Sequence, residues 1–189
     1  MTWERQFNSK TTLTGIRGLR LGSEWWFARA AWRLVTKILE IKHGSSHYED
    51  ALKLRECQLR SPLGLTLDAE DVKDERRQVH FGVLHPVLGL CACVALLIDK
   101  DISEARLRQM TVESRLQGGG VGRKLFDFVE AWCLANSISQ ITLNARVVSK
   151  GFYQKLGFSE CGSEFNHITL PHIRMSKSLW RSVFRLIKE

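Results

Sequence analysis

The sequence lacks the features that mark a secreted or membrane-spanning protein. Its five cysteines are an odd number, stand at no disulfide-like or C-x-x-C spacing, and occur in a chain without an apolar signal peptide. We therefore expect reduced thiols and a cytoplasmic protein. A spanning helix is excluded too, because three cations interrupt the apolar stretch after Ser23, which is already too short.

Clusters of metal ligands are also missing. Cys91 and Cys93 would lie on one face of a strand, but no second cysteine pair or histidine completes a set of four ligands. We expect these thiols to pack in an apolar core and expect no metal. His43 and His47 flank a Gly-Ser-Ser segment and are expected to be loop residues.

The middle of the chain has no net positive charge. The net charge is +8, but residues 1–45 contribute +5 and residues 174–189 contribute +4, which leaves −1 between them. A nucleic-acid-binding domain would carry a basic face on its folded body. We therefore expect no nucleic-acid partner.

The chain of 189 residues is long enough for one domain with its own core. We expect an N-terminal basic and aromatic extension with one helix (1–37), a central domain (38–178) and a C-terminal amphipathic helix (179–189). The first helix, from Ser23 to about Leu39, carries a stripe of three cations on an apolar surface. It can dock on the central domain or on a second subunit as a homodimer, lie on a membrane surface, or belong to a targeting presequence.

The central domain shows strand and helix patterns that alternate, which predicts a mixed α/β sheet. The expected elements are a strand at 39–42, a helix at 46–60, a hairpin of strands 79–84 and 88–98, a strand at 105–113, a helix at 121–136, a strand at 141–145, a helix at 148–156, and strands at 158–164 and 170–177. In the strand at 105–113, simple alternation places Leu107, Gln109 and Thr111 on one face and Met110 and Val112 on the other. The acidic segment 67–77 is expected to be a short exposed helix or a substrate-side loop.

The most informative stretch is Gln117–Lys124, which has glycine at four of the five positions from 118 to 122. It lies between a predicted strand and a predicted helix. Glycine lets the backbone approach a ligand without a Cβ, and a helix start directs unpaired N–H groups and positive dipole into the turn. The turn is predicted to bind a phosphate or pyrophosphate, and Arg123 and Lys124 add positive charge.

Two common phosphate-turn patterns do not fit this stretch. A Walker A turn ends in G-K-[ST], whereas Gly122 is followed by Arg123. The dinucleotide pattern G-x-G-x-x-G needs a third glycine where Arg123 or Leu125 stands, and an acidic residue about 20 positions later that segment 141–144 does not contain.

The pattern Q/R-x-x-G-x-G/A does fit, at Gln117, Gly120 and Gly122. About 30 residues later, the segment Gly151–Phe158 matches F/L-Y-x-K-x-G-F. On these two motifs, in this order, the chain resembles the GNAT superfamily of N-acetyltransferases. The ending Pro171-His172-Ile173-x-Met175 resembles the ElaA-like branch.

The resemblance implies a GNAT-like sheet of about seven strands with a splayed central parallel pair, flanking helices, and extra terminal helices. It implies acetyl-CoA as co-substrate, with main-chain groups of Met110 and Val112 on the pantetheine and Asn144 facing them. It implies that the pyrophosphate is bound by the N–H groups of the turn, at Gln117, Gly118, Gly119, Gly120, Val121, Gly122 and Arg123.

Tyr153 is implied as the general acid that protonates the departing thiolate, since a phenol stays protonated at neutral pH. The alternative is that Tyr153 and Phe152 only form the wall of the coenzyme channel. Many family members carry Asn three residues before Ala ahead of the Phe-Tyr pair, whereas Arg146 and Ser149 stand here. Asn144 is a partial substitute for that Asn.

The function implied is acetyl-CoA-dependent N-acetylation of a primary amine on a small molecule or protein. Glu113, His80 and His172 are candidate general bases, and the sequence does not choose among them or name the acceptor. The alternative function is a catalytically silent acyl-CoA-binding module that recruits a partner or a membrane through its aromatic terminal helices.

Overall fold

The computed structural model describes residues 37–68 and 72–179, so the helices expected at each end of the chain lie almost entirely outside the described residues. The described residues form one mixed sheet with strand order β1-β2-β3-β4-β5-β8-β6, in which β7 pairs with β8. The strands are β1 (Lys37–Ile41), β2 (Val79–His85), β3 (Gly89–Asp99), β4 (Glu104–Val112), β5 (Gln140–Arg146), β6 (Ser159–Glu160), β7 (Phe165–His167) and β8 (Leu170–Ser178). The predicted mixed α/β fold is confirmed.

Two strand predictions differ in detail. The strand expected at 158–164 is two short strands, β6 and β7, which gives eight strands among the described residues. Strand β1 begins at Lys37, inside the stretch assigned to the end of the N-terminal helix, because Lys37–Ile41 pairs antiparallel with β2. Backbone pairing with the sheet prevails there over the helical spacing of the apolar residues.

The main helices are α2 (Ser46–Arg55), α4 (Val121–Ala135) and α5 (Lys150–Lys155). The Ser45 side chain caps α2 by accepting the Tyr48 N–H at 3.3 Å. A π-helical turn, η1 (Glu56–Arg60), and a 3₁₀ turn, η2 (Ser61–Leu63), continue α2, and the chain turns away at Gly64 with φ +70°. Three more 3₁₀ turns are η3 (Glu75–Arg77), η4 (Ser114–Leu116) and η5 (Val147–Ser149).

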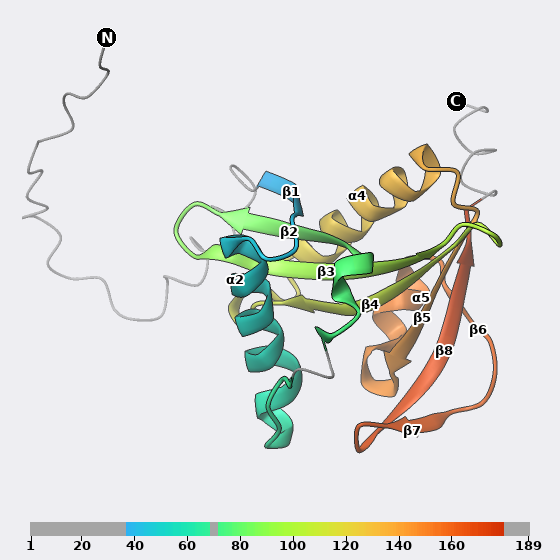
Figure 1. The fold of residues 1–189 in the computed structure, drawn as a ribbon. Coiled ribbons are helices and arrows are strands. Elements are labelled where there is room, and N and C mark those ends of the chain that lie inside the picture. The colour runs from blue at the N-terminus through green and yellow to red at the C-terminus, as the bar shows by residue number, and fades with distance from the viewer. Residues whose placement is uncertain (1–36, 69–71, 180–189) are drawn as a thin grey trace, which may run out of the picture.

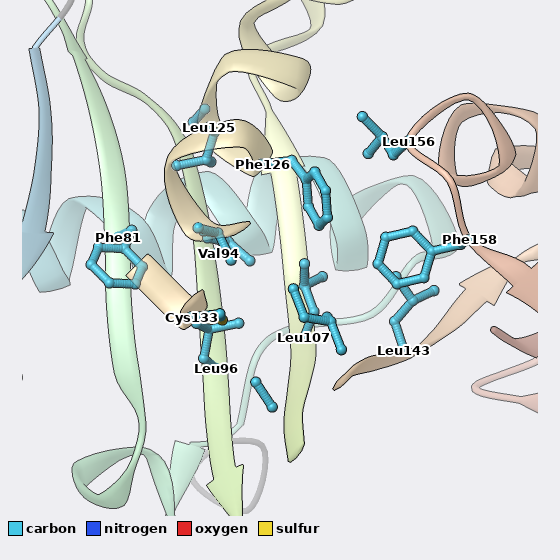
Figure 2. Close-up of a cluster of buried hydrophobic side chains, with 14 of the residues drawn as sticks. Phe81, Val94, Leu96, Leu107, Leu125, Phe126, Cys133, Leu143, Leu156 and Phe158 are labelled. Carbon is cyan, nitrogen blue, oxygen red and sulfur yellow. The ribbon is translucent and has the colours of Figure 1, made fainter. Parts of the chain in front are cut away.

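Helices cover both faces of the sheet (Figure 1). Helix α2 packs over β1–β3 in a small cluster that contains Tyr48, Leu54 and Cys93. Helix α4 covers the other face in the larger cluster, where Phe126 contacts Phe158 with ring centroids 5.4 Å apart. Figure 2 shows these two rings beside Leu107 of β4 and Leu143 of β5. The buried sheet therefore separates an α2 side from an α4 side.

A β-bulge separates Cys91 from Cys93. The pairing of β2 with β3 shifts between Val83 and Leu84, so β3 carries one extra residue at that point. Cys91 consequently packs in the larger cluster, and its thiol donates to Val83 O at 3.3 Å, whereas Cys93 packs in the small cluster under α2. The expectation that both sulfurs share one face is wrong, and burial raises the pKa of the Cys91 thiol to about 11.

A second bulge lies in β4. Cys93 pairs with Thr111 and Ala95 with Arg108, so two residues of β4, Gln109 and Met110, stand opposite a single residue of β3. Gln109 has φ +51°. The bulge reverses the alternation, and Met110 and Val112 pack with the larger cluster on the same side as Leu107. The simple alternation predicted for this strand is therefore wrong beyond Arg108.

The acidic segment 67–77 is not wholly exposed, because Glu75 lies in the interior. Its carboxylate accepts two bonds from Arg55, at 2.6 and 2.9 Å, and one from the Tyr48 hydroxyl at 2.7 Å. Glu75 is 1% exposed and Arg55 is 2% exposed. This ion pair fastens η3 to α2 across 20 residues of sequence.

Candidate active site

Strands β4 and β5 form a parallel pair that separates partway along. Their pairing runs from Glu104 with Gln140 to Leu107 with Leu143, while β4 continues to Val112. A cleft of about 1230 Å³ opens where the strands diverge. The β4 bulge coincides with this divergence, because it begins two residues after the last parallel pair.

The main chain of Val112 faces the gap. Glu113 N–H donates to Cys91 O at 2.8 Å, and in an antiparallel ladder the neighbouring residue then directs its own N–H and C=O away from that partner. Val112 therefore turns these groups away from β3, and its carbonyl accepts a bond from Gln117 Nε2 at 2.9 Å. Met110 and Asn144 also line the cleft, so the structure brings together the residues predicted to flank the pantetheine.

The glycine turn lies at the end of this gap. Gly118 has φ +70°, and Gly120, the N-cap of α4, has φ +90°, a conformation that glycine adopts without cost. The first helical bond of α4 runs from Lys124 N–H to Gly120 O, so the N–H groups of Val121, Gly122 and Arg123 have no partner within the helix.

Not every residue of the turn faces the cleft. Gly119 and Val121 do not line it: Gly119 N–H donates to Leu116 O at 3.2 Å, and Val121 is buried in the core. The Arg123 side chain lies along the cleft wall, where Nη2 donates to Lys155 O at 2.7 Å. Arg123 thereby connects the start of α4 to the end of α5.

Gly122 connects the two sequence motifs. A Cβ at this position would lie 3.2 Å from Phe152 Cζ and 3.5 Å from Val112 Cγ2. The Phe152 ring, which is part of the downstream motif, therefore occupies the space over the helix start that a side chain would need. A residue larger than glycine at position 122 would have to displace this ring.

Tyr153 lies half-buried beside the cleft, with Phe152 and Phe158 at ring-centroid distances of 5.1 and 5.8 Å. Burial raises the pKa of its phenol to about 12. The hydroxyl therefore remains protonated across the physiological range, which suits a proton donor.

The three candidate bases occupy different places. His172 lines the cleft, whereas Glu113 and His80 do not. Glu113 pairs with Arg115 at 3.2 Å outside the cleft. His80 is 3% exposed under α2, where Nε2 lies 3.0 Å from Glu75 O, and burial lowers its pKa.

The cleft also contains side chains that sequence reasoning did not single out. They are Arg60 from η1, Arg106, Arg108 and Gln109 from β4, and His167 from β7. Gln109 Oε1 is buried and has no hydrogen-bond partner among the described residues, so it is an acceptor available to a ligand. The two arginines at alternate positions of one strand, 106 and 108, were the signal available in the sequence.

Within the described ranges, no group of three or more His, Cys, Asp or Glu side chains is placed to hold a metal ion. Over the same ranges, no helix is long and apolar enough to cross a membrane.

Two parallel strands that diverge, and a glycine-capped helix that starts at the end of the gap, form the architecture that the GNAT resemblance predicted. The family model for the acetyltransferase (GNAT) domain matches residues 91–179, a range that contains the gap, the glycine turn and the Phe-Tyr motif. Residues 91–179 thus match the GNAT acetyltransferase domain, and the resemblance predicted from the two motifs is confirmed.

The curated relatives share low sequence identity with this chain, over less than half of its length. The uncharacterized protein YyaT of Bacillus subtilis is 25% identical over 79 residues, which are 42% of this chain and 53% of YyaT. The matched region thus spans about half the length of this curated relative.

Solved structures share the fold over most of the chain. Escherichia coli ElaA superposes with a TM-score of 0.65 and 20% identity, covering 76% of this chain and 99% of ElaA. An aminoglycoside 6'-N-acetyltransferase complexed with coenzyme A gives a TM-score of 0.63 at 17% identity, covering 76% and 97% of the two chains. These likenesses establish a common fold.

Proposed function

We propose that the protein is an N-acetyltransferase that moves an acetyl group from acetyl-CoA to a primary amine of a small molecule or protein, in the cytoplasm. One observation carries the proposal: the parallel pairing of β4 with β5 stops at Leu107 and Leu143, and the gap leads to the open helix start at Gly120–Arg123. A solved neighbour that holds coenzyme A on the same fold supports this ligand.

The coenzyme would be held mainly by backbone groups. The N–H groups of Gly118 and Gly120 and of the first turn of α4, at Val121, Gly122 and Arg123, are suited to the pyrophosphate. Gln117 fixes the end of β4 through its bond to Val112 O. Gly119 gives the turn its shape, since its own N–H is bonded within the turn.

The pantetheine arm would lie in the gap, against Val112 and Met110 on β4 and Asn144 on β5. The Val112 N–H faces this gap and can donate to an amide of the arm. When bound, acetyl-CoA supplies the acetyl group as a thioester, and an amine that attacks it releases the coenzyme as a thiolate.

Tyr153 would donate the proton that the leaving group needs. Tyr153 lies on α5, the short helix that also contains Phe152 and Lys155. Because Arg123 of α4 donates to the Lys155 carbonyl, α5 and Tyr153 are held close to the start of α4. The raised pKa means that the proton is on the oxygen at the moment of transfer.

His172 is the base that the geometry favours. Nδ1 lies 2.9 Å from Leu170 O, and because a carbonyl only accepts, Nδ1 carries the hydrogen. The neutral ring then presents Nε2 as a proton acceptor. His172 is 8% exposed and lines the cleft, so it can take the proton of an amine that has entered.

The test is thiol release from acetyl-CoA with a panel of primary amines, together with a separate measurement of coenzyme binding by calorimetry. We expect turnover in the wild type, no coenzyme binding in Gly120→Asp, and normal binding with little turnover in Tyr153→Phe and His172→Gln. Gly44→Asp is the matched control, because Gly44 also has positive φ, +76°, with open space around it, and lies outside the cleft.

Unchanged coenzyme affinity in Gly120→Asp would exclude the turn as the binding site. Coenzyme binding without turnover on any amine would instead support the silent binding module. An unchanged rate in Tyr153→Phe would leave Tyr153 as part of the channel wall.

A further inference from the structure

Arginines from three separate segments meet in the part of the cleft that lies away from the glycine turn. They are Arg60 of η1, Arg106 and Arg108 of β4, and Arg146 of β5. Among the described residues that line the cleft, Asp68 is the single acidic side chain. The three arginines of β4 and β5 make the wall that these strands form positive, although the middle of the chain as a whole has a net charge of about −1.

The sheet places these arginines on the α2 side. Ala105 and Leu107 of β4 and Ala145 of β5 belong to the larger cluster on the α4 side, so the alternate residues 106, 108 and 146 face the opposite way. Arg146 confirms this orientation, because Nη2 donates to Leu59 O of η1 at 2.8 Å.

The arginines are separate from the proposed phosphate site. Arg108 precedes Val112 by four residues, about 13 Å along a strand at roughly 3.3 Å per residue, and the glycine turn follows Val112. Helix α4, which begins at this turn, packs on the other side of the sheet. The cluster is therefore not needed to hold the pyrophosphate and faces the end of the cleft from which an acceptor would enter.

Two of these cations are withdrawn from water to different degrees and repel each other. Arg60 is 8% exposed and Arg146 is half-buried. The pKa of Arg146 is lowered by burial first and by the charge of Arg60 second. Partial burial of the Arg146 guanidinium beside a second positive charge costs free energy, which an anionic ligand would offset.

Arg106 and Arg108 lie at the mouth of the same region. Arg106 is exposed and Arg108 is half-buried, and neither makes a hydrogen bond or ion pair with another described residue. Guanidinium groups bind carboxylate and phosphate oxygens through two parallel N–H bonds. The pair thus offers donors where a substrate would arrive.

From this arrangement we infer that the amine acceptor carries an anionic group, a carboxylate or a phosphate, which the arginines of β4 and β5 bind while the amine is directed toward His172. The inference rests on the proposed transferase function and specifies its substrate class. Polycationic amines are the class that this cleft repels.

The experiment uses pairs of amines that differ in the anion alone: ω-amino carboxylates of increasing length against their amides, and phosphoethanolamine against ethanolamine, with spermidine as the polycation. Thiol release from acetyl-CoA gives kcat/KM, and calorimetry on the coenzyme A-saturated protein gives acceptor affinity without turnover. We expect kcat/KM about tenfold or more higher for anionic members, as for one charge-assisted contact. The favoured anion, carboxylate or phosphate, identifies the natural group.

Arg106→Gln and Arg108→Gln should each reduce that preference, and the double variant should abolish it, while coenzyme affinity is unchanged. Arg77→Gln is the control, because Arg77 is an exposed arginine outside the cleft. Equal or better use of amides, ethanolamine or spermidine would overturn the inference, as would a preference that survives the double variant. If no amine releases thiol, the proposed function fails, and the calorimetric comparison still decides whether the arginines bind anions.

Discussion

The buried ion pair between Arg55 and Glu75 offers the largest predicted effect of a single substitution. Arg55→Met removes both guanidinium donors, at 2.6 and 2.9 Å, and leaves the Glu75 carboxylate in the interior with the Tyr48 hydroxyl as its remaining side-chain donor among the described residues. Both side chains are at most 2% exposed, so water cannot replace the lost bonds. We expect a loss of about 3–5 kcal/mol in the free energy of unfolding.

The double variant Arg55→Met/Glu75→Leu distinguishes two causes of lost stability, a buried carboxylate without its ion-pair partner and a loss of side-chain packing. Replacing both members of a buried pair by apolar side chains of similar size is often close to neutral. The remaining cost is the Tyr48 hydroxyl without its acceptor, about 1–3 kcal/mol. The double variant should therefore be more stable than Arg55→Met alone.

Lys53→Met provides the matched control on the same helix. Lys53 pairs with Asp50 at 3.8 Å, and its side chain is 78% exposed, so its removal should cost less than about 1 kcal/mol. Urea unfolding followed by far-UV circular dichroism measures all four proteins. A loss in Arg55→Met no larger than in Lys53→Met, or a double variant less stable than the single, would refute the reasoning.

Three further predictions concern the cleft and the core. Gly122→Ala should weaken coenzyme binding several-fold by displacing Phe152, whereas Gly151→Ala, with open space around it, should not, as calorimetry can measure. Because burial lowers the pKa of His80, the unfolded chain binds a proton more readily, so stability should fall as pH drops below about 6.5, and His80→Gln should flatten that slope in urea titrations. Because the pKa of Tyr153 is raised to about 12, kcat should not decline between pH 9 and pH 10.5 through loss of the phenolic proton; a decline that Tyr153→Phe removes would contradict the assignment.

Local patterns predicted the elements well because each element is signalled by its own residues. Ser45 caps α2 as its hydroxyl allows, and the glycine turn ends at the start of α4, where the periodicity changes. The proposed coenzyme side of the cleft is built largely from consecutive residues around this turn. Their proximity could therefore be predicted from sequence, while their contacts with a coenzyme stay a prediction.

The bulges could not be predicted in the same way. One extra residue near Cys91 and another at Gln109 reverse the direction of every later side chain in the strand, yet neither position carries glycine or another marker. The positive φ of Gln109 is maintained by pairing on either side of it, and that pairing depends on β3. The orientation of Met110 and Val112 was consequently misassigned.

Long-range polar contacts were missed for a related reason. In the sequence, Glu75 is one of several acidic residues in a charged segment, and nothing near it marks it as buried. Its partner, Arg55, lies 20 residues earlier in the chain. The sequence of α2 contains one indication of this contact, because Arg55 lies on the same helix face as the buried Tyr48 and Ala51. An arginine on the apolar face of a helix indicates a buried partner, but not which one.

The bulge in β4 explains how one strand can serve two ligands. Before it, Arg106 and Arg108 face the α2 side and the proposed acceptor half of the cleft. After it, Met110 and Val112 turn their side chains into the α4-side core while the Val112 main chain faces the gap. Without the extra residue, Met110 and Val112 would continue the arginine face, and their apolar side chains would lie among the cations. The reversal of side-chain direction at the bulge therefore keeps the proposed anion site and the proposed coenzyme channel adjacent along one strand, with charged side chains in the first and apolar side chains beside the second.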